Sequence, residues 1–290
     1  MNRKLVSILK KEGLEHLSKV FLEQGVTDSI LSELSDGDLR ELGIEKLGER
    51  KRLLAAFMSE GGAQNEPGAM VEVQGGALPG GKKVGSFAIG KFAVTMDEWR
   101  MVREWALEKG FEMATGRAGG LKHPVTEINW YDALKWCNAK SEMEGLGTVY
   151  TLEGRPYKKG ESADVACNWR TGGYRLPAEA EWGWAARGGV KSCGSEYAGG
   201  DNLDAVGWYG GNSGGMCHPV GQKAPNELGL FDMSGNVVEW CWDLNDVCRV
   251  TRGGSWDFVA AYCSSADRYY FSPVIRNNVI GFRLALVPSL

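Results

Sequence analysis

The residues best able to do chemistry in this 290-residue chain are seven cysteines and three histidines. Thiolates and imidazoles can hold a transition metal, and a thiolate beside a histidine can act as a nucleophile. Cys217-His218 and the wide Cys241/Cys248 pair lack the tight paired spacing of zinc sites. Cys263 has no histidine near it in the sequence, so we favour a small core residue over a nucleophile there. The histidines also show no metal-ligand spacing: His16, His123 and His218.

Composition narrows the classes of protein further. A chain of this length with 43% hydrophobic residues can bury one sizeable core and a small second domain. The formal net charge of -4 argues against a basic face, so no nucleic-acid partner is expected. No apolar run is long enough to span a bilayer, so no membrane span is expected either.

The N-terminus and the cysteines bear on localisation. Residues 1–5 run directly into amphipathic sequence containing Lys10, Lys11 and Glu12, so no signal peptide is visible. An odd number of cysteines at irregular spacing favours reduced thiols. We therefore expect a cytoplasmic protein, with a trimmed export signal and surface display as the open alternative.

The elements that must position these residues fall into two parts joined by a linker. Residues 1–59 carry apolar residues at three- and four-residue spacing, which predicts helices. Residues 60–82 are rich in glycine and proline and read as a linker. These glycines do not form a phosphate loop, because no strand precedes them and no Gly-Lys-Ser/Thr follows. Residues 83–290 form the second part, with short strands and many tryptophans.

Four strings in residues 1–59 carry a specific pattern: Gly13-Leu14-Glu15-His16-Leu17, Phe21-Leu22-Glu23-Gln24-Gly25-Val26, and residues 34–39 and 42–50. Together they resemble a sterile alpha motif (SAM) domain. The resemblance implies a five-helix bundle of a kind that commonly self-associates head to tail. We therefore expect a homo-oligomer formed through residues 1–59.

Charged residues of this part have two possible roles. Asp36 and Asp38 on one side, and Arg50, Lys51 and Arg52 on the other, could form the two faces of a head-to-tail contact. The same charges could equally be a solvated helical surface.

The second part begins with a strand and continues with helices. Residues 85–95 alternate like an edge strand, and residues 97–105 and 131–140 should be helical. Residues 174–182 read as strand, turn and helix, with Pro177 suited to the first helical position. Most tryptophans of this part are expected in the core, because rings fill the gaps of irregular folds: Trp130, Trp136, Trp182, Trp184, Trp208, Trp240 and Trp242.

Several motifs of this part occur in one order: residues 124–130, 174–182 and 226–240, then Arg252-Gly253-Gly254-Ser255-Trp256. Together they resemble the formylglycine-generating-enzyme/sulfatase-modifying-factor family over residues 83–286. The resemblance implies an α+β fold that elaborates the C-type-lectin-like domain. Such a domain has little regular structure, a small twisted antiparallel sheet and long packed loops.

The same resemblance implies which residues an enzyme of this family would need for catalysis. The family's enzymes oxidise a substrate cysteine with two active-site cysteines, which would fall at Phe258 and Cys263 of this chain. One cysteine is therefore absent, and a single thiolate cannot replace the two that hold copper(I). We expect no catalysis and no required cofactor. A cysteine oxidase, or a related oxidoreductase relying on Cys263, is the alternative.

The family can also hold a structural calcium. The matching positions are Asp232 and Glu239, with carbonyl oxygens of Gly235 and Val237. Oxygen ligands suit this hard cation. The alternative is that the two carboxylates cap turns and pair with arginines.

Residues 257–279, between two fixed motifs, mix small residues with many rings. The segment ends in Arg276-Asn277-Asn278-Val279-Ile280-Gly281-Phe282-Arg283. It resembles the variable region of proteins diversified by a retroelement, in which reverse transcription rewrites template adenines. The resemblance implies that the following residues contact a ligand: Asp257, Phe258, Val259, Tyr262, Asp267, Tyr269, Tyr270, Phe271, Val274, Ile275, Asn277, Asn278 and Val279.

Codon chemistry agrees with this interpretation. Replacing adenines in an AAY codon can give any NNY codon, and these cannot encode Lys, Glu, Gln, Trp or Met. None of those residue types stands at the variable positions. Tyr269, Tyr270 and Phe271 cannot all point inward from one strand, since side chains alternate, so at least one should be exposed.

We therefore favour a non-catalytic protein that binds an unknown protein or other macromolecule through this segment. The rings could instead be the core of a degenerate enzyme domain. A third possibility is a purely structural assembly module.

Overall fold

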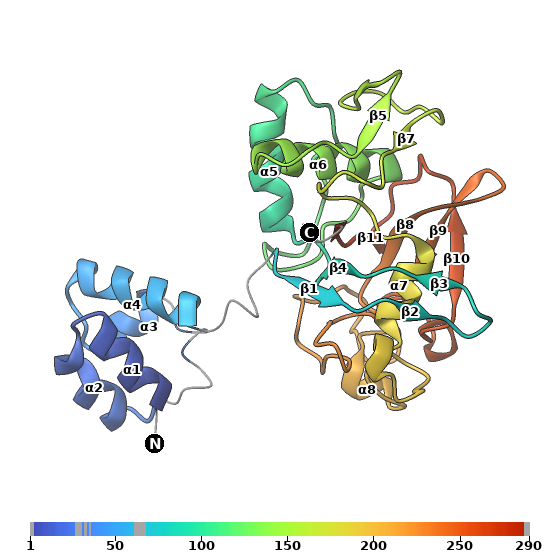
Figure 1. The fold of residues 1–290 in the computed structure, drawn as a ribbon. Coiled ribbons are helices and arrows are strands. Elements are labelled where there is room, and N and C mark those ends of the chain that lie inside the picture. Colours follow the sequence, from blue (N-terminus) through green and yellow to red (C-terminus); the bar gives the residue numbers. More distant parts are fainter. Residues whose placement is uncertain (1–2, 27–30, 32–33, 35, 61–67, 287–290) are drawn as a thin grey trace. The chain divides into compact units, whose positions relative to one another are not determined.

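The structure, a computed structural model, describes residues 3–26, 31, 34, 36–60 and 68–286 (Figure 1). The chain forms two compact units, Met1–Ala69 and Met70–Leu290. Over the described ranges, no helix has the length and apolar character needed to cross a membrane.

The smaller unit is a bundle of short helices around one apolar core. The helices are α1 (Arg3–Lys11), η1 (Glu15–Leu17), α2 (Ser18–Glu23), α3 (Asp36–Glu41) and α4 (Leu47–Glu60). Each contributes buried side chains, among them Leu9, Phe21 and Leu53. Gly43 has a φ of 83°, a left-handed conformation that ends the helical run after α3.

One charge predicted for a contact face lies inside this unit. Arg50 is 4% exposed, and its Nη1 donates to the carbonyl oxygens of Ile44 (2.9 Å) and Glu45 (2.6 Å). These carbonyls precede α4 and need donors, so the predicted place of Arg50 on an exposed face is wrong. Lys51 and Arg52 are exposed. The side chain of Asp36 lies outside the described residues.

The larger unit begins earlier than the predicted linker boundary. Strand β1 (Met70–Val73) pairs with β4 (Phe87–Gly90), and β2 (Gly76–Ala77) pairs with β3 (Lys83–Val84). Glycine is required here by close packing rather than by flexibility. A Cβ on Gly76 would lie 2.3 Å from the ring of Trp184, and one on Gly75 would lie 2.6 Å from the Val84 carbonyl oxygen. The prediction of a linker to residue 82 is therefore wrong over residues 70–82.

The predicted edge strand is a central one. β4 lies between β1 and β12 (Ala285–Leu286), and all four of its residues are buried. Three strands form a separate small sheet: β5 (Tyr150–Leu152), β6 (Arg155–Pro156) and β7 (Ala166–Cys167).

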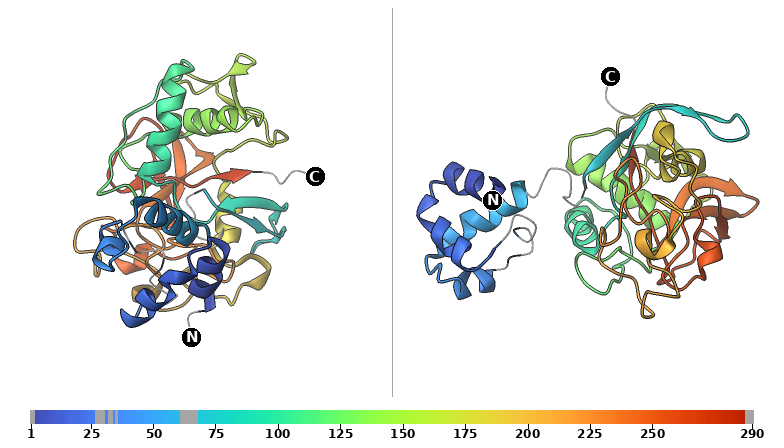
Figure 2. Two further views of the ribbon diagram at one scale, coloured as in Figure 1. Left: turned by 90° about the vertical axis from the view of Figure 1, so that its left-hand side faces the viewer. Right: turned by 90° about the horizontal axis from the view of Figure 1, so that it is seen from below.

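The two predicted long helices are present and begin with capping boxes. α5 (Met96–Glu108) is capped by Thr95 and Glu98, and α6 (Trp130–Met143) by Asn129 and Asp132. Figure 1 and Figure 2 show α5 and α6 packed against each other. The short helices are α7 (Glu179–Ala186), η3 (Gly189–Lys191), α8 (Leu203–Val206) and η4 (Ala260–Tyr262).

Pro177 does not occupy the first helical position that was predicted for it. α7 begins at Glu179 with Ala178 as its N-cap, and the Ala178 amide donates to the Glu181 carboxylate (2.8 Å). Pro177 instead precedes the cap, and its carbonyl accepts from the Trp242 amide (3.0 Å). No named strand precedes the helix here, and Arg175 makes only an isolated bridge with Ala285.

The largest sheet positions the closing segment of the chain. Its order is β10 (Arg268–Phe271), β9 (Cys248–Arg252), β8 (Val238–Asn245) and β11 (Ile280–Gly281). β9 is antiparallel to both neighbours, whereas β11 is parallel to β8. α7 packs against β8 and β9 on one face of this sheet.

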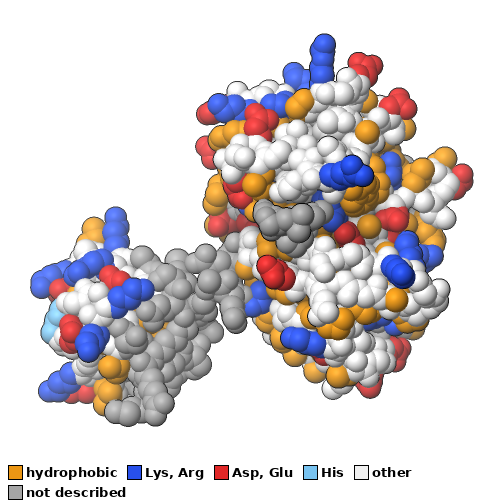
Figure 3. Space-filling model, viewed as in Figure 1, with side chains coloured by type: hydrophobic (Ala, Val, Ile, Leu, Met, Phe, Trp, Pro, Cys, Tyr) orange, Lys and Arg blue, Asp and Glu red, His pale blue; other side chains and the backbone are white. Residues whose placement is uncertain are grey.

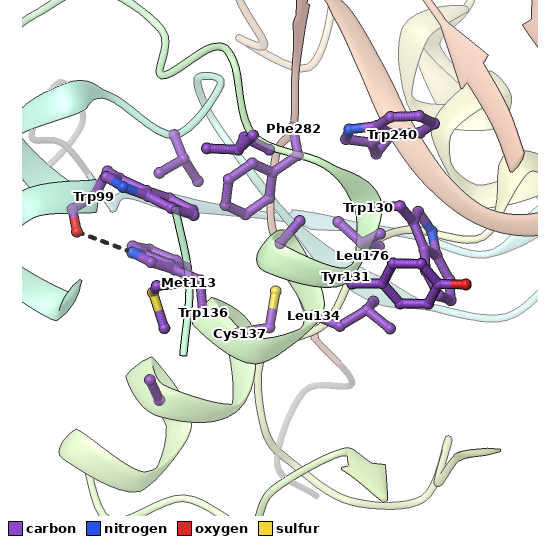
Figure 4. Packing of buried hydrophobic residues seen from close by; sticks show 14 of the residues in the cluster. Trp99, Met113, Trp130, Tyr131, Leu134, Trp136, Cys137, Leu176, Trp240 and Phe282 are labelled. Atoms are coloured by element: carbon purple, nitrogen blue, oxygen red, sulfur yellow. Dashed lines mark hydrogen bonds between the residues drawn. The ribbon is translucent and has the colours of Figure 1, made fainter. Parts of the chain in front are cut away.

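The aromatic core lies between this sheet and the two long helices. Trp99 and Trp136 stack with ring centroids 6.0 Å apart, Trp136 Nε1 donates to the Trp99 carbonyl oxygen (3.2 Å), and Phe282 packs edge-on against both (Figure 4). The prediction that most tryptophans are core residues is confirmed. Trp208 and Trp242 are half-buried, and the others are buried: Trp130, Trp136, Trp182, Trp184 and Trp240.

Candidate binding surface

The closing segment is a loop whose two ends are held together. Trp256, just after β9, donates from its indole Nε1 to the carbonyl oxygen of Asn278 (3.2 Å), just before β11. The amide of Trp256 donates to the Asn236 carbonyl oxygen (2.9 Å), and the amide of Val238 to that of Val279 (2.9 Å). The turn before β8 and the first residue of β8 therefore hold both ends of the loop.

Arg252 holds the middle of the loop from below. Its guanidinium is buried and donates to three successive carbonyl oxygens, those of Ser265 (2.9 Å), Ala266 (3.1 Å) and Asp267. Burial lowers the pKa of Arg252, and Glu179 at 3.9 Å partly offsets this. The bonds go to backbone atoms, so they do not depend on which side chains the loop carries.

Arg276 fastens the far part of the loop to α6. Its guanidinium donates to Asp132 (2.9 Å) and to Glu161 (3.1 Å). Asp132 is also the capping residue of α6, so one carboxylate serves both the helix and the loop. Two backbone bonds join the same elements: the Trp130 amide donates to the Pro273 carbonyl oxygen, and the Glu127 amide to that of Asn277 (both 3.1 Å).

Three rings of the loop form a cluster, the Phe258–Tyr262–Tyr269 cluster. Tyr269 contacts Phe258 edge-on with centroids 5.0 Å apart and lies 6.5 Å from the ring of Tyr262. The Tyr269 hydroxyl donates to the Tyr262 carbonyl oxygen (2.6 Å), and burial raises the pKa of this phenol. Phe258 and Tyr269 are half-buried, whereas Tyr262 is 57% exposed. Tyr262 is thus the ring of this cluster with most surface available to a partner.

β10 places its three consecutive rings on two faces of the sheet. Tyr269 pairs with Thr251 and Phe271 with Arg249, on the face that carries Trp240. Tyr270 points to the opposite face, as adjacent strand residues must, and is 42% exposed. The expectation that at least one ring is exposed is confirmed. Tyr270 does not share a surface with Tyr269 and Phe271.

Twelve of the thirteen predicted contact residues retain solvent exposure. Val279 does not: it is 7% exposed and packs into the main core, because its backbone is bonded to β8. Its place in a contact surface is therefore wrong for this structure. Four are half-buried: Phe258, Asp267, Tyr269 and Phe271. Eight are exposed: Asp257, Val259, Tyr262, Tyr270, Val274, Ile275, Asn277 and Asn278.

The fold brings together Phe258 and Cys263, the two positions at which the resemblance implies the cysteines of the family's enzymes. Phe258 packs against a buried cluster that contains Cys263, Leu203 and Val206. Cys263 is 0% exposed, and burial raises the pKa of its thiol to about 12. A thiol in this setting is protonated at neutral pH and is a poor nucleophile. The prediction that Cys263 is a core residue is confirmed.

The predicted calcium ligands do not form a fitting site. Both oxygens of Glu239 are already used: Oε1 accepts from Arg283 (2.7 Å), and Oε2 accepts from Arg283 and Trp182 (both 2.6 Å). Asp232 is buried and its Oδ2 accepts from the Gly221 amide (2.8 Å). Its Oδ1 has no hydrogen-bond partner in the described part of the chain, and burial raises its pKa to about 6. Asp232 alone could receive a cation, but Glu239 is neutralised by arginine.

Other metal chemistry finds no support in the side chains. Among the described residues, no three His, Cys, Asp or Glu side chains gather where they could hold an ion. On the face of the larger unit visible in Figure 3, acidic, basic and hydrophobic side chains are interspersed. That face therefore carries no extended basic patch of the kind that binds nucleic acid.

The residues that sequence reasoning missed are the anchors of the loop. Arg252, Asp132 and Glu161 lie outside residues 257–279, and their partners are carbonyl oxygens or a distant arginine. Asp132 could have been found from the Asn129–Asp132 capping spacing. For Arg252 the sequence offers only weak evidence, an arginine at the end of a buried strand.

Comparison with known proteins covers both units. Residues 57–287 match the model of the sulfatase-modifying factor enzyme 1-like domain, and residues 5–59 match that of the SAM domain (sterile alpha motif). The resemblances inferred for the two parts of the chain are thereby confirmed.

Three similar proteins differ in what their names state. The chaperone protein LppX of Paenibacillus barcinonensis is 36% identical over 64% of this chain and 78% of its own length. The formylglycine-generating enzyme of Streptomyces coelicolor is 31% identical over 59% of this chain, which spans only 54% of that enzyme. The solved structure of Treponema denticola variable protein 1 is 30% identical with a TM-score of 0.62, covering 76% of this chain and 94% of that one.

Proposed function

The chain belongs to the sulfatase-modifying factor enzyme 1-like family, with an α+β, C-type-lectin-like fold and a SAM domain, and we propose that it is a non-catalytic ligand-binding protein. In this proposal the surface of residues 257–278 is diversified by a retroelement. The ligand is a protein or another macromolecule.

The observation that carries the proposal is the way the loop is anchored. Arg252, Trp130 and Glu127 bond to its carbonyl oxygens, and every residue has such an oxygen whatever its side chain. Side chains at the exposed positions can therefore change while the backbone keeps its course. Displaying variable side chains on a fixed backbone is also how antibody loops recognise diverse ligands.

A named relative supports the same proposal. The Treponema denticola protein is called a variable protein, and 94% of its length aligns with 76% of this chain. The lack of catalysis is argued from Phe258, which stands where the enzymes carry a cysteine, and from the buried thiol of Cys263. Two soft ligands are needed to hold copper(I), and positions 258 and 263 together offer one.

The SAM domain would assemble copies of the chain. Self-association places several weak binding surfaces at high effective concentration, which raises avidity without any new contact at each surface. Lys51 on α4 is exposed and available to such a contact. Arg52 is also exposed but donates to the Glu12 carbonyl oxygen (3.0 Å), and Arg50 is buried.

A genomic observation tests the diversification directly. We expect a near-copy of the DNA encoding residues 256–282, differing at adenines and lying beside a reverse-transcriptase gene. A genome that contains this gene with no such copy would overturn the proposal.

The competing function is cysteine oxidation, favoured by the similarity to a formylglycine-generating enzyme. Oxygen uptake with a cysteine-containing peptide, dependent on copper(I) and abolished by Cys263→Ser, would establish it. We expect neither uptake nor any effect of that substitution on oxygen consumption.

A further inference from the structure

Resting on the proposed function, we infer that this chain's loop takes a cationic ligand: a protein segment that presents lysine or arginine beside aliphatic side chains. The surface in question is defined by Asp257, Val259 and Tyr262. Its apolar groups, its free carboxylate and the ion pairs of the two exposed arginines of the loop, Arg268 and Arg276, carry the inference.

The apolar part of this surface comes from one turn. Val259 is the N-cap of η4, and Tyr262 is its last residue, so a single helical turn presents both. They are 60% and 57% exposed, more than the other large hydrophobic residues of the loop. Tyr262 is supported from one side by Tyr269. An exposed and supported ring of this kind offers a face to a cation or an aliphatic chain.

The basic side chains of the loop are already neutralised. Arg268 bonds to Glu179, and Arg276 bonds to Asp132 and Glu161. Arg252 keeps its charge but is buried, where its guanidinium donates to carbonyl oxygens and lies 3.9 Å from Glu179. An anionic ligand would therefore find no exposed, unpaired cation in residues 257–279, all of which the structure describes.

The carboxylates of the loop are not equivalent. Asp267 Oδ2 accepts from the Ser264 amide (3.1 Å) and so stabilises the loop itself. Asp257 is exposed, and within the described residues its carboxylate has no hydrogen bond or ion pair. Asp257 is thus the charge of the loop that remains free for a partner.

Neighbouring loops bring negative charge next to other residues of the loop. The Ser265 amide donates to the Glu196 carbonyl oxygen (3.0 Å), which brings exposed Glu196 beside the loop. Asp204, also exposed, lies near Phe258 through the 209–212 turn, because Asn212 donates to Asp204 and the Gly210 amide donates to Phe258. The nearby basic group, Lys223, is held by the Asp204 carbonyl oxygen and stacks on Trp208.

A lysine or arginine placed on the Tyr262 ring would find the free carboxylate of Asp257 on the same segment, five residues earlier in the chain. Cation–π attraction and a carboxylate act together on such a group, while Val259 contacts its aliphatic neighbour. An acidic segment would meet repulsion from Asp257 without any compensating pair.

The test uses the full chain and three synthetic peptides as probes. Each peptide is an acetylated nonapeptide of glycine and leucine with three lysines, three glutamates or three glutamines at the same positions. Binding is measured by NMR titration at low and high salt. We expect the lysine peptide to bind at least about tenfold more tightly than the glutamate peptide, with affinity falling as salt rises.

Matched variants locate the binding. Asp257→Asn and Tyr262→Ala should each weaken the lysine peptide by roughly three- to tenfold. Asp246→Asn is the control, because Asp246 is also exposed but lies at the turn between β8 and β9. It should leave the affinity unchanged.

Two results would overturn the inference in different ways. Tighter binding of the glutamate or glutamine peptide, still sensitive to Tyr262→Ala, would refute the cationic ligand and keep the binding surface. Failure of all three peptides to bind at up to about 1 mM would refute the ligand class altogether. Neither result bears on the template repeat, which tests the proposed function separately.

Discussion

At the scale of single residues, Arg252 is the side chain on which the shape of the loop depends most. We predict that Arg252→Lys destabilises the protein by about 2–3 kcal/mol, because one ammonium cannot replace a guanidinium that serves three carbonyl oxygens in buried and part-buried hydrogen bonds. Amide exchange should quicken in residues 264–268. Urea denaturation and hydrogen exchange measure the two effects.

The matched control is Arg268→Lys, which changes an exposed pair with Glu179 and should cost less than about 1 kcal/mol. Equal losses for the two variants would show that Arg252 has no special role in holding the loop.

Removing an exposed ring of the loop should cost little stability, whereas removing a packed ring should cost more. Tyr262→Ala should change the free energy of unfolding by less than about 0.5 kcal/mol, since the ring is mostly exposed. Tyr269→Ala should cost about 1–3 kcal/mol, because it removes the contact with Phe258 and the bond to the Tyr262 carbonyl oxygen. Thermal or urea unfolding distinguishes them. The reverse order would mean that Tyr262 is buried in solution.

Asp232 should make stability depend on pH. Burial raises its pKa from 3.8 to about 6, so between these values the folded chain holds a proton that the unfolded chain has lost. The stability this gives is complete below about pH 4 and disappears as the pH rises through about 6. The free energy of unfolding of Asp232→Asn should therefore be higher than that of the wild type by roughly 1–3 kcal/mol at pH 7 and equal to it near pH 4. Urea denaturation at the two pH values measures the difference.

Calcium binding at Asp232 would give the opposite result in this experiment. If Asp232→Asn were less stable at pH 7, and added calcium stabilised the wild type alone, the calcium prediction would be restored. Glu239 argues against that result, because Arg283 already neutralises it in the core.

At the scale of elements, local signals predicted some parts and could not predict others. The starts of α5 and α6 can be predicted from capping spacings, Thr95 with Glu98 and Asn129 with Asp132. β1 and β2 have no such local signal. Gly75 and Gly76 resemble a linker in the sequence, because the groups they pack against, the Val84 carbonyl and the Trp184 ring, lie further along the chain. The residues that anchor the loop could not be predicted for a similar reason. Their partners are backbone carbonyl oxygens, which every residue has, so no residue type in the sequence indicates them.

Truncation tests where the larger unit begins. A chain starting at Met70 should fold, whereas one starting at Lys83 loses β1 and β2 and leaves β4 without one of its two neighbours. Buried residues of β4, such as Ile89, would then face water. Circular dichroism melts of the two fragments check this. Cooperative melting of both at one temperature would return residues 70–82 to the role of a linker.

At the scale of the whole molecule, the proposed function gives the two units different roles, ligand binding and self-association. A single loop with eight exposed contact residues, among them Val259 and Tyr262, is expected to bind weakly by itself. A SAM domain in the same chain turns weak binding into strong binding if it assembles several copies. The function proposed for the larger unit therefore leads to an expectation about the smaller one.

We predict that the full chain forms oligomers and that a fragment of residues 70–290 is monomeric, as measured by light scattering after size-exclusion chromatography. Lys51→Glu should reduce the mass of the oligomer, because exposed Lys51 lies on the face of α4 predicted to carry the contact. Lys10→Glu, an equal charge change on α1, is the control and should not. If the fragment formed oligomers of as many chains as the full-length protein, association would belong to the lectin-like unit, and the avidity argument would fail.

If Lys51→Glu alone dissociated the oligomer, multivalent binding to a surface coated with the lysine peptide should weaken in that variant. The affinity of each single site should stay the same.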